Sequence, residues 1–208
     1  MKHSWTVTCK CGTEIPLQAS GSGPFKDTDC PKCFARICII DDGIISQRVL
    51  NRSLQELQTS DFTFAIILSA MAVEYELSRL FIKWKAIDLM PTTATPNDEE
   101  SWDEELRKAY KILARLDLVS QFLTKQTFDV FLANDAALTK SVQARHPDLT
   151  TPASKYFESN LFWKRNQIVH ARNLDSSEPD AQACHDRAYS LFLILSRMDG
   201  VRYNAGNG

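Results

Sequence analysis

The 208-residue sequence contains no apolar run long enough to span a membrane. Its longest run begins at Phe62 and reaches Val73 before Glu74 interrupts it, whereas a membrane-spanning helix needs roughly 20 apolar residues. The first residues, MKHSWTVTCK, also lack the apolar core of a signal peptide. We therefore expect a cytoplasmic protein that is neither exported nor bound to a membrane.

A strongly basic composition is absent as well. The net charge is −2, which argues against a protein that coats nucleic acid with its whole surface. Charge is uneven along the chain, however, because residues 140–173 hold six basic side chains against two acidic ones. This segment is the basic part of an otherwise acidic protein, and the net charge does not exclude a local nucleic-acid patch.

Internal repeats and low-complexity segments are also missing. With 44% hydrophobic and 24% charged residues, the composition is typical of a globular protein that buries a core. After Ser53 the β-prone stretches with glycine and proline give way to helical periodicity. The sequence therefore predicts a small N-terminal unit at residues 1–48 and a main domain at residues 53–200.

Four of the six cysteines lie within the first 33 residues. Cys9 and Cys11 form a C-x-C pair, Cys30 and Cys33 form a C-x2-C pair, and eighteen residues separate the two pairs. In a reducing compartment such thiols are read as metal ligands before disulfides, and tight turns at this spacing can bring four thiolates to one zinc ion. Because four thiolates leave no open position on the ion, such a zinc site would be structural. Redox-active thiols are the alternative interpretation.

Short β-prone stretches flank the two cysteine pairs. WTVTC precedes the first pair, ARICIID follows the second, and ARICIID with DDG and IISQRVL at residues 44–50 reads as a hairpin. Over residues 5–48 the chain resembles a zinc ribbon, which is too small to be held by apolar burial alone. One structural zinc ion is therefore expected to supply much of the folding free energy. Cys38 and Cys184 are expected to be small buried apolar residues.

The first long helix is predicted between Asp61 and Met90, where Pro91 ends it. This segment is apolar on nearly every side, which is typical of a helix at the centre of its fold or covered by a partner subunit. Glu76 is expected to pair with Arg79 on an exposed strip of this helix. Because of its apolar surface, the helix is also a candidate for part of a dimer interface.

The following helices are less sharply bounded. Ser101 with Glu104 predicts a capping box at the start of the next helix. Helical spacing then continues to Phe131, either as one long helix or as two helices broken near Asp117, since neither glycine nor proline marks a break.

Two more helices complete the chain. Thr151 is expected to cap the first of them, with Pro152 at its first position, and Gly200 is expected to end the second. The last helix has a clean apolar stripe: Cys184, Ala188, Leu191, Leu195 and Met198. The predicted fold class is therefore mainly α, with an antiparallel bundle of four or five helices after a small β zinc ribbon.

The stretch FWKRNQIVHARN, at residues 162–173, carries polar residues where the penultimate helix is expected. Arg165, Asn166 and His170 in this stretch resemble the R-x4-H signature of the HEPN superfamily, in which a polar residue commonly follows the arginine. By helix order and motif position, the resemblance covers residues 60–200. It implies an endoribonuclease that needs no metal for catalysis and acts as a homodimer, with two motif helices facing each other across a cleft.

The residue types suit that chemistry. Histidine titrates nearest to neutral pH, so His170 would move protons at the attacking 2′-hydroxyl or the leaving 5′-oxygen. A guanidinium can meet the charge on the phosphorane with paired hydrogen bonds, which is the role expected of Arg165. Asn166 lies four residues before His170, so the amide can orient the imidazole.

Helix geometry adds a constraint. Arg165 and His170 are five residues apart, roughly 140° round a helix, so one motif alone does not aim both at one phosphate. A composite site built from two copies resolves this. Family members often place an acidic residue on an early helix, and Glu74 is the candidate partner of Arg165 or His170. Lys164 and Arg172 are expected to contact RNA.

Non-catalytic interpretations stay open. The motif could belong to a degenerate family member that binds RNA or a protein without cutting, or it could be a coincidence on a polar surface. In the main alternative, the protein is an adaptor whose ribbon docks a partner while the bundle dimerises. Family membership suggests a microbial defence effector or a toxin, with an antitoxin or another protein as partner.

Overall fold

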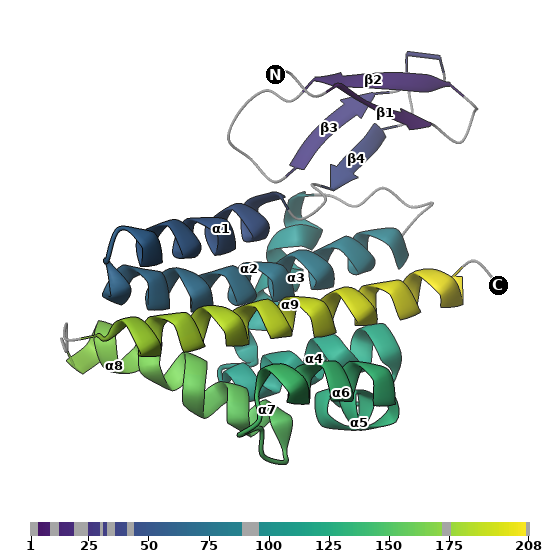
Figure 1. The fold of residues 1–208 in the computed structure, drawn as a ribbon. Coiled ribbons are helices and arrows are strands. Elements are labelled where there is room, and N and C mark those ends of the chain that lie inside the picture. Colours follow the sequence, from purple (N-terminus) through teal and green to yellow (C-terminus); the bar gives the residue numbers. More distant parts are fainter. Residues whose placement is uncertain are drawn as a thin grey trace.

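In the computed structural model of the chain, the described residues are 4–8, 13–18, 25–29, 31–32, 36–40, 44–88, 96–171 and 176–206. They are mainly helical, as predicted (Figure 1). The four cysteines expected to bind zinc lie outside these residues, and so does Arg172. No helix within the described ranges has the length and apolar character needed to cross a membrane.

Two antiparallel strand pairs precede the helices. Strand β1 (Ser4–Thr8) pairs with β2 (Glu14–Gln18), and β3 (Phe25–Asp29) pairs with β4 (Arg36–Ile40). Strands were expected at WTVTC and ARICIID, and β1 and β4 confirm both. The segments that join the strands within each pair contain the C-x-C and C-x2-C motifs.

Helix α1 (Ile44–Gln58) replaces the strand expected at IISQRVL, so that prediction was wrong. Its buried positions, Ser46, Leu50, Ser53 and Glu56, recur every three or four residues, which is the period of a helix face rather than of a strand. This face packs against α2. The helical unit therefore begins at residue 44 and spans the boundary expected between residues 48 and 53.

Helix α2 (Phe62–Asp88) is the central element, which confirms the expectation from its all-round apolar surface. It contacts α1, α3, α4, α8 and α9. Glu76 does pair with Arg79, with 2.6 Å between nitrogen and oxygen. The strip is not exposed, however: Glu76 is 5% exposed, and its carboxylate also accepts a hydrogen bond from Ser46 at 2.5 Å.

Four shorter helices follow: α3 (Pro96–Lys108), α4 (Ile112–Thr124), α5 (Phe128–Asn134) and α6 (Ala136–Arg145). The capping box was wrong, because Ser101 lies inside α3. The breaks fall at residues 109–111 and 125–127 rather than near Asp117. Lys125 ends α4 in the left-handed conformation at φ 63°, and the Asp117 carboxylate accepts the backbone N–H of Phe128 at 2.9 Å.

The next helix is continuous from Ala153 to Ala171, and it consists of α7 (Ala153–Phe157), a π-turn called η1 (Glu158–Phe162) and α8 (Trp163–Ala171). Thr151 does not cap it. Instead, Asp129 of α5 accepts hydrogen bonds from the backbone N–H and the hydroxyl of Ser154, at 2.9 and 2.5 Å. A cap supplied by a distant helix fixes α7 on α5.

Helix α9 (Glu178–Gly206) confirms the predicted apolar stripe, which is buried throughout. Gly200 lies within this helix and does not end it, so that prediction was wrong. Burial raises the pKa of the Cys184 thiol to about 11, as fits the expected buried apolar cysteine. The side chain of Cys38 is not among those described.

The helices are not uniformly antiparallel. α1 and α2 are, because a short turn joins them, but α9 runs in the same direction as α2 (Figure 1). Trp84 near the end of α2 donates to Asp199 at 2.5 Å, and Arg202 pairs with Asp88 at 2.5 Å. The long connection through α3 to α8 returns the chain to the start of α2 and so allows this parallel packing.

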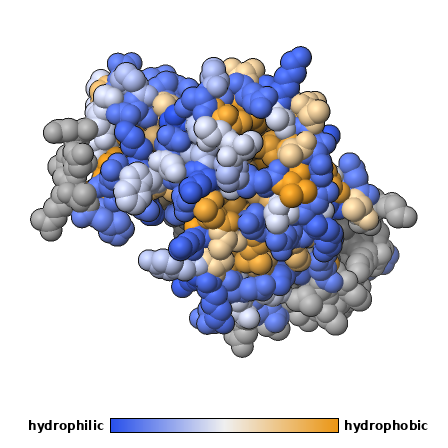
Figure 2. Space-filling view, turned by 90° about the horizontal axis from the view of Figure 1, so that it is seen from below, coloured by the Kyte–Doolittle hydropathy of each residue, from blue (hydrophilic) through white to orange (hydrophobic). Residues whose placement is uncertain are grey.

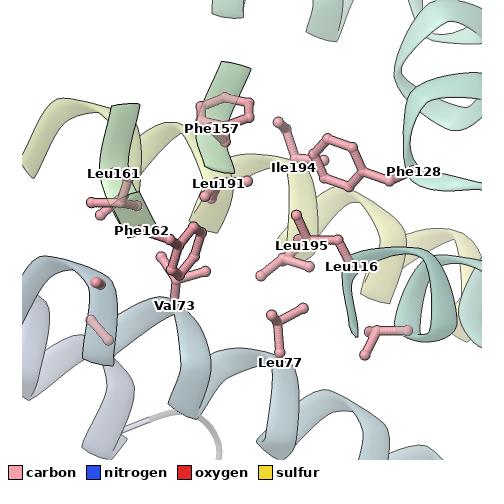
Figure 3. Packing of buried hydrophobic residues seen from close by; sticks show 14 of the residues in the cluster. Val73, Leu77, Leu116, Phe128, Phe157, Leu161, Phe162, Leu191, Ile194 and Leu195 are labelled. Atoms are coloured by element: carbon pink, nitrogen blue, oxygen red, sulfur yellow. The ribbon is translucent and has the colours of Figure 1, made fainter. Parts of the chain in front are cut away.

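The core lies where α2, α4, η1 and α9 meet. Figure 3 shows Val73 and Leu77 of α2 facing Leu116, Phe162, Leu191 and Leu195, which belong to the three other elements. Burial of such side chains contributes about 1.5–3 kcal/mol each. The outer face seen from below carries apolar patches among polar residues (Figure 2).

Candidate functional site

The predicted motif lies on α8, and its arginine is held from two sides. Arg165 donates one hydrogen bond to the amide oxygen of Asn166 at 2.9 Å and pairs with Glu74 of α2 at 3.3 Å. The side chains of Arg165 and Glu74 are 27% and 28% exposed. The structure thus brings together three of the four residues expected to carry catalysis.

Buried apolar residues three positions before and three positions after Arg165 determine this placement. Phe162 and Ile168 are buried, and they belong to the elements that pack on α2. Because residues three positions apart lie on one side of a helix, Arg165 lies on the side of α8 that faces α2, at the edge of the packed interface, where its side chain is 27% exposed. Glu74 follows the buried Val73 on α2 and meets Arg165 at this edge.

Glu74 and Asn166 do not satisfy every N–H group of Arg165. Its Nε is buried and has no hydrogen-bond partner among the described residues. An unpaired buried N–H costs about 1–3 kcal/mol, so the guanidinium is not fully satisfied by Glu74 and Asn166. A further acceptor, such as a phosphate oxygen, would satisfy it if the side chain shifted.

The motif borders a cleft of about 830 Å³. The residues of α8 and α2 on its wall are Trp163, Arg165, Asn166, His170 and Glu74. The turn between α3 and α4, the first part of α4, and η1 form the rest, with polar residues Tyr110, Lys111, Arg115, Glu158 and Ser159. His170 is exposed, and it lines the cleft together with Arg165 although the two residues are five positions apart. The cleft thus brings all four predicted catalytic residues to one place.

The cleft carries more positive than negative charge. Lys111, Arg115 and Arg165 line it against Glu74 and Glu158. Arg115 donates from Nε to the backbone carbonyl of Ala109 at 3.0 Å, which fixes its stem against the turn. This balance favours an anionic ligand.

The two residues expected to contact RNA are not part of this arrangement. Lys164 pairs with Asp180 of α9 at 2.9 Å and does not line the cleft. Their hydrogen bond lowers the pKa of the Asp180 carboxyl. Arg172 lies outside the described residues.

Sequence reasoning missed the cleft residues that lie outside the motif. Tyr110, Lys111 and Arg115 were not singled out, because nothing in the sequence marked the break between α3 and α4. Trp163 was not predicted either, although it lies two residues before Arg165. The usable signal was the dipeptide Tyr110-Lys111, which interrupts an apolar helix pattern with an aromatic and a cation.

A second polar cluster lies at the other end of the same continuous helix. His146 and Ser190 share a hydrogen bond of 2.9 Å, and both side chains are buried. Tyr156 donates to Asp148 at 2.9 Å and accepts from Arg187 at 3.2 Å. Burial, aided by the charge of Arg187, lowers the pKa of His146, and burial raises the pKa of Tyr156. This Arg187 cluster ties α7 to α9.

In the described part of the chain, no three or more histidine, cysteine, aspartate or glutamate side chains are grouped so that they could hold a metal ion. The predicted zinc ligands Cys9, Cys11, Cys30 and Cys33 fall outside that part.

Comparisons with family models, with curated proteins and with solved structures find no match. The resemblance to the HEPN superfamily therefore depends on the motif and on where the fold places it.

Proposed function

We propose that the protein is a metal-independent endoribonuclease of the HEPN type. The observation that carries the proposal is the cleft in which Glu74, Arg165, Asn166 and His170 come together from α2 and α8. These groups can bind a phosphodiester, stabilise added negative charge and transfer a proton. A surplus of cationic groups on the cleft wall supports an anionic substrate.

The reaction follows from the donor set. The ribose 2′-oxygen attacks the adjacent phosphorus and loses its proton, while the bond to the 5′-oxygen breaks and that oxygen gains a proton. His170 is the group that transfers one of these protons, and Arg165 meets the charge on the nonbridging oxygens. The products are a 2′,3′-cyclic phosphate and a 5′-hydroxyl.

Glu74 and Asn166 act as positioning residues. Their hydrogen bonds to Arg165 fix two sides of the guanidinium, so that its remaining N–H groups are presented to one phosphate. A carboxylate this close also offsets part of the positive charge. Replacing Glu74 with glutamine keeps the size of the side chain and removes that charge.

We further propose that the N-terminal unit is a zinc ribbon and that the active form is a homodimer. The paired strands enclose the two cysteine motifs in sequence, as expected of a ribbon that Cys9, Cys11, Cys30 and Cys33 would complete. Metal content measured on purified protein, in comparison with a Cys30→Ser and Cys33→Ser variant, tests the ribbon. Its expected value is one zinc per chain.

The decisive experiment for the ribonuclease uses purified full-length protein, 5′-labelled RNA and EDTA. Wild-type protein should cut the RNA and leave cyclic phosphate ends, and Arg165→Ala and His170→Ala should each reduce cleavage about 100-fold or more. The matched control is Arg197→Ala, which removes an exposed arginine that pairs with Asp135 on another face of the bundle. Circular dichroism confirms that each variant is folded.

The adaptor alternative makes the opposite prediction. If both variants retain every measurable function and wild-type protein cuts no RNA, the ribonuclease proposal is wrong. RNA binding without cleavage would identify a degenerate member of the family.

A further inference from the structure

Two large aromatic side chains project from the wall of the cleft. Tyr110, in the turn between α3 and α4, is 88% exposed, and Trp163, the first residue of α8, is 59% exposed. Both line the same cleft as Arg165 and His170. Within the described part of the chain, neither the Tyr110 hydroxyl nor the Trp163 indole N–H has a hydrogen-bond partner.

Such exposure calls for an explanation, because tryptophan is highly buried in most proteins. The other aromatic side chains near α8 follow that rule: Phe162 and Phe157 are 4% and 0% exposed. Trp163 follows Phe162 directly and therefore points to another side of the helix. The fold thus leaves a large flat ring in water at the edge of a polar cleft.

The neighbouring side chains are cationic. Lys111 follows Tyr110, is exposed, and has no ion-pair partner among the described residues. Arg115 uses its Nε to hold the turn at the carbonyl of Ala109, and its two terminal nitrogens form no hydrogen bond within the described ranges. Unlike Arg165, these two cations have no carboxylate at hydrogen-bond distance among the residues that the structure describes.

Exposed rings beside unpaired cations are what single-stranded nucleic acids bind. Each unpaired base can stack on an aromatic ring, while lysine and arginine contact the phosphates between bases. A duplex cannot use such rings, because its bases already stack on one another. A protein partner would favour a contiguous apolar patch over a wall with three cations and two carboxylates.

The anchored turn gives the rings a fixed position. The hydrogen bond from Arg115 to Ala109 joins α4 to the first residue of the turn, and the N–H of Tyr110 donates to the carbonyl of Lys108 at 2.8 Å. A ring held on a fixed backbone loses little conformational entropy when a base stacks on it.

We propose that Tyr110 and Trp163 are a base-stacking subsite for single-stranded RNA, with Lys111 and Arg115 holding the phosphates beside it. This inference rests on the proposed ribonuclease function and names the substrate class of its cleft. The subsite would hold nucleotides next to the bond that Arg165 and His170 act upon, and it would exclude paired RNA.

The test measures binding separately from cleavage. The affinity of full-length His170→Ala protein, in which cleavage is expected to be reduced about 100-fold or more, is measured by anisotropy. The ligands are a fluorescein-labelled 12-nucleotide oligouridylate and a 12-base-pair RNA duplex. Tyr110→Leu and Trp163→Leu should each weaken single-strand binding about tenfold, because each removes a stacking ring and keeps apolar bulk. Trp163→Phe should restore most of the loss.

The matched control is Tyr203→Leu, since Tyr203 is 62% exposed on α9 and does not line the cleft. This change should leave the affinity unaltered. Lys111→Ala and Arg115→Ala should weaken binding and also lower its dependence on salt concentration, as expected for lost phosphate contacts.

Three results would overturn the subsite. They are equal affinity of the leucine variants and the parent, duplex binding as tight as single-strand binding, and a leucine variant that changes from dimer to monomer in light scattering while its RNA affinity stays the same. The last result would assign the rings to an interface between copies. If RNA affinity depends on the two rings but wild-type protein cuts no RNA, the stacking subsite is supported and the ribonuclease proposal is wrong.

Discussion

The continuous helix from Ala153 to Ala171 has a cluster of arginine, histidine and carboxylate at each end. The two clusters differ in burial and in how fully their polar groups are hydrogen-bonded. In the Arg187 cluster, His146, Tyr156 and Ser190 are at most 5% exposed and bonded to one another or to charged neighbours. Around Arg165, the histidine is exposed and one buried N–H has no partner among the described residues. Similar residue types thus serve structure at one end and remain available for chemistry at the other.

The difference comes from what packs over each end. Helix α9 covers the start of the helix, so polar groups there must satisfy one another. At the other end, the turn between α3 and α4 stands across a cleft from α8 and leaves one side of the motif open. A histidine next to an arginine is therefore not a functional signal until its burial is known.

The largest expected effect is a difference between the two arginines: replacing Arg165 should reduce cleavage, whereas replacing Arg187 should reduce stability. Arg165→Ala should reduce RNA cleavage about 100-fold or more and change the free energy of unfolding by less than about 1 kcal/mol. Arg187→Ala should lower the free energy of unfolding by about 1–3 kcal/mol, because Tyr156 and the carbonyl of Asn160 lose a donor. Urea unfolding and cleavage assays on the same preparations check both.

The comparison would fail if Arg187→Ala abolished cleavage while the protein remained folded. The reverse failure is a loss of stability from Arg165→Ala as large as that from Arg187→Ala. Either result would show that the two clusters act as one unit through the helix between them.

A smaller effect is expected at the cap of α7. Asp129→Ala removes both acceptors of Ser154 and should lower the free energy of unfolding by about 1–2 kcal/mol. The matched control is Asp103→Ala, which breaks an exposed pair with Arg107 one turn away and should cost less than about 0.5 kcal/mol. Equal urea midpoints for the two variants would contradict a capping role.

The smallest effect concerns pH. Burial lowers the pKa of His146 and of His185 below the ordinary 6.5, so the unfolded chain binds protons that the folded chain resists. Their stabilising contribution is complete above pH 6.5 and decreases as pH falls from 6.5 toward the lowered folded values. Urea midpoints at pH 7.5 and 5.5 should differ less in His146→Gln than in wild-type protein. An unchanged difference would show that His146 does not contribute.

Much of the helical fold could be predicted, because long apolar patterns determine it. The centre of α2 and the buried stripe of α9 follow directly from the spacing of their apolar residues. The motif on α8 could also be predicted, and Glu74, expected to be a partner of Arg165 or His170, pairs with Arg165.

The predicted ends of the helices were wrong most often, because tertiary contacts determine where these helices end. Asp129 caps α7 from another helix, and Lys125 ends α4 in a conformation that sequence patterns assign to glycine. Gly200 lies inside α9, where the buried stripe before it and the pairing of Arg202 with Asp88 after it outweigh its low helix propensity. Tyr110 and Lys111 reached the cleft only through such an unmarked break.

The π-turn at Glu158–Phe162 holds one residue more than an ordinary helical turn, and this gives the cleft a degree of evolutionary freedom. Deletion of one residue at this point is expected to convert the π-turn into an ordinary helical turn, so that α7 keeps its contact with α5 and Arg165 keeps its alignment with Glu74. The same deletion inside α8 would rotate every later motif residue by about 100°. Changes at Glu158 and Ser159 on the cleft wall are thus expected to leave the placement of Arg165 and His170 unaltered.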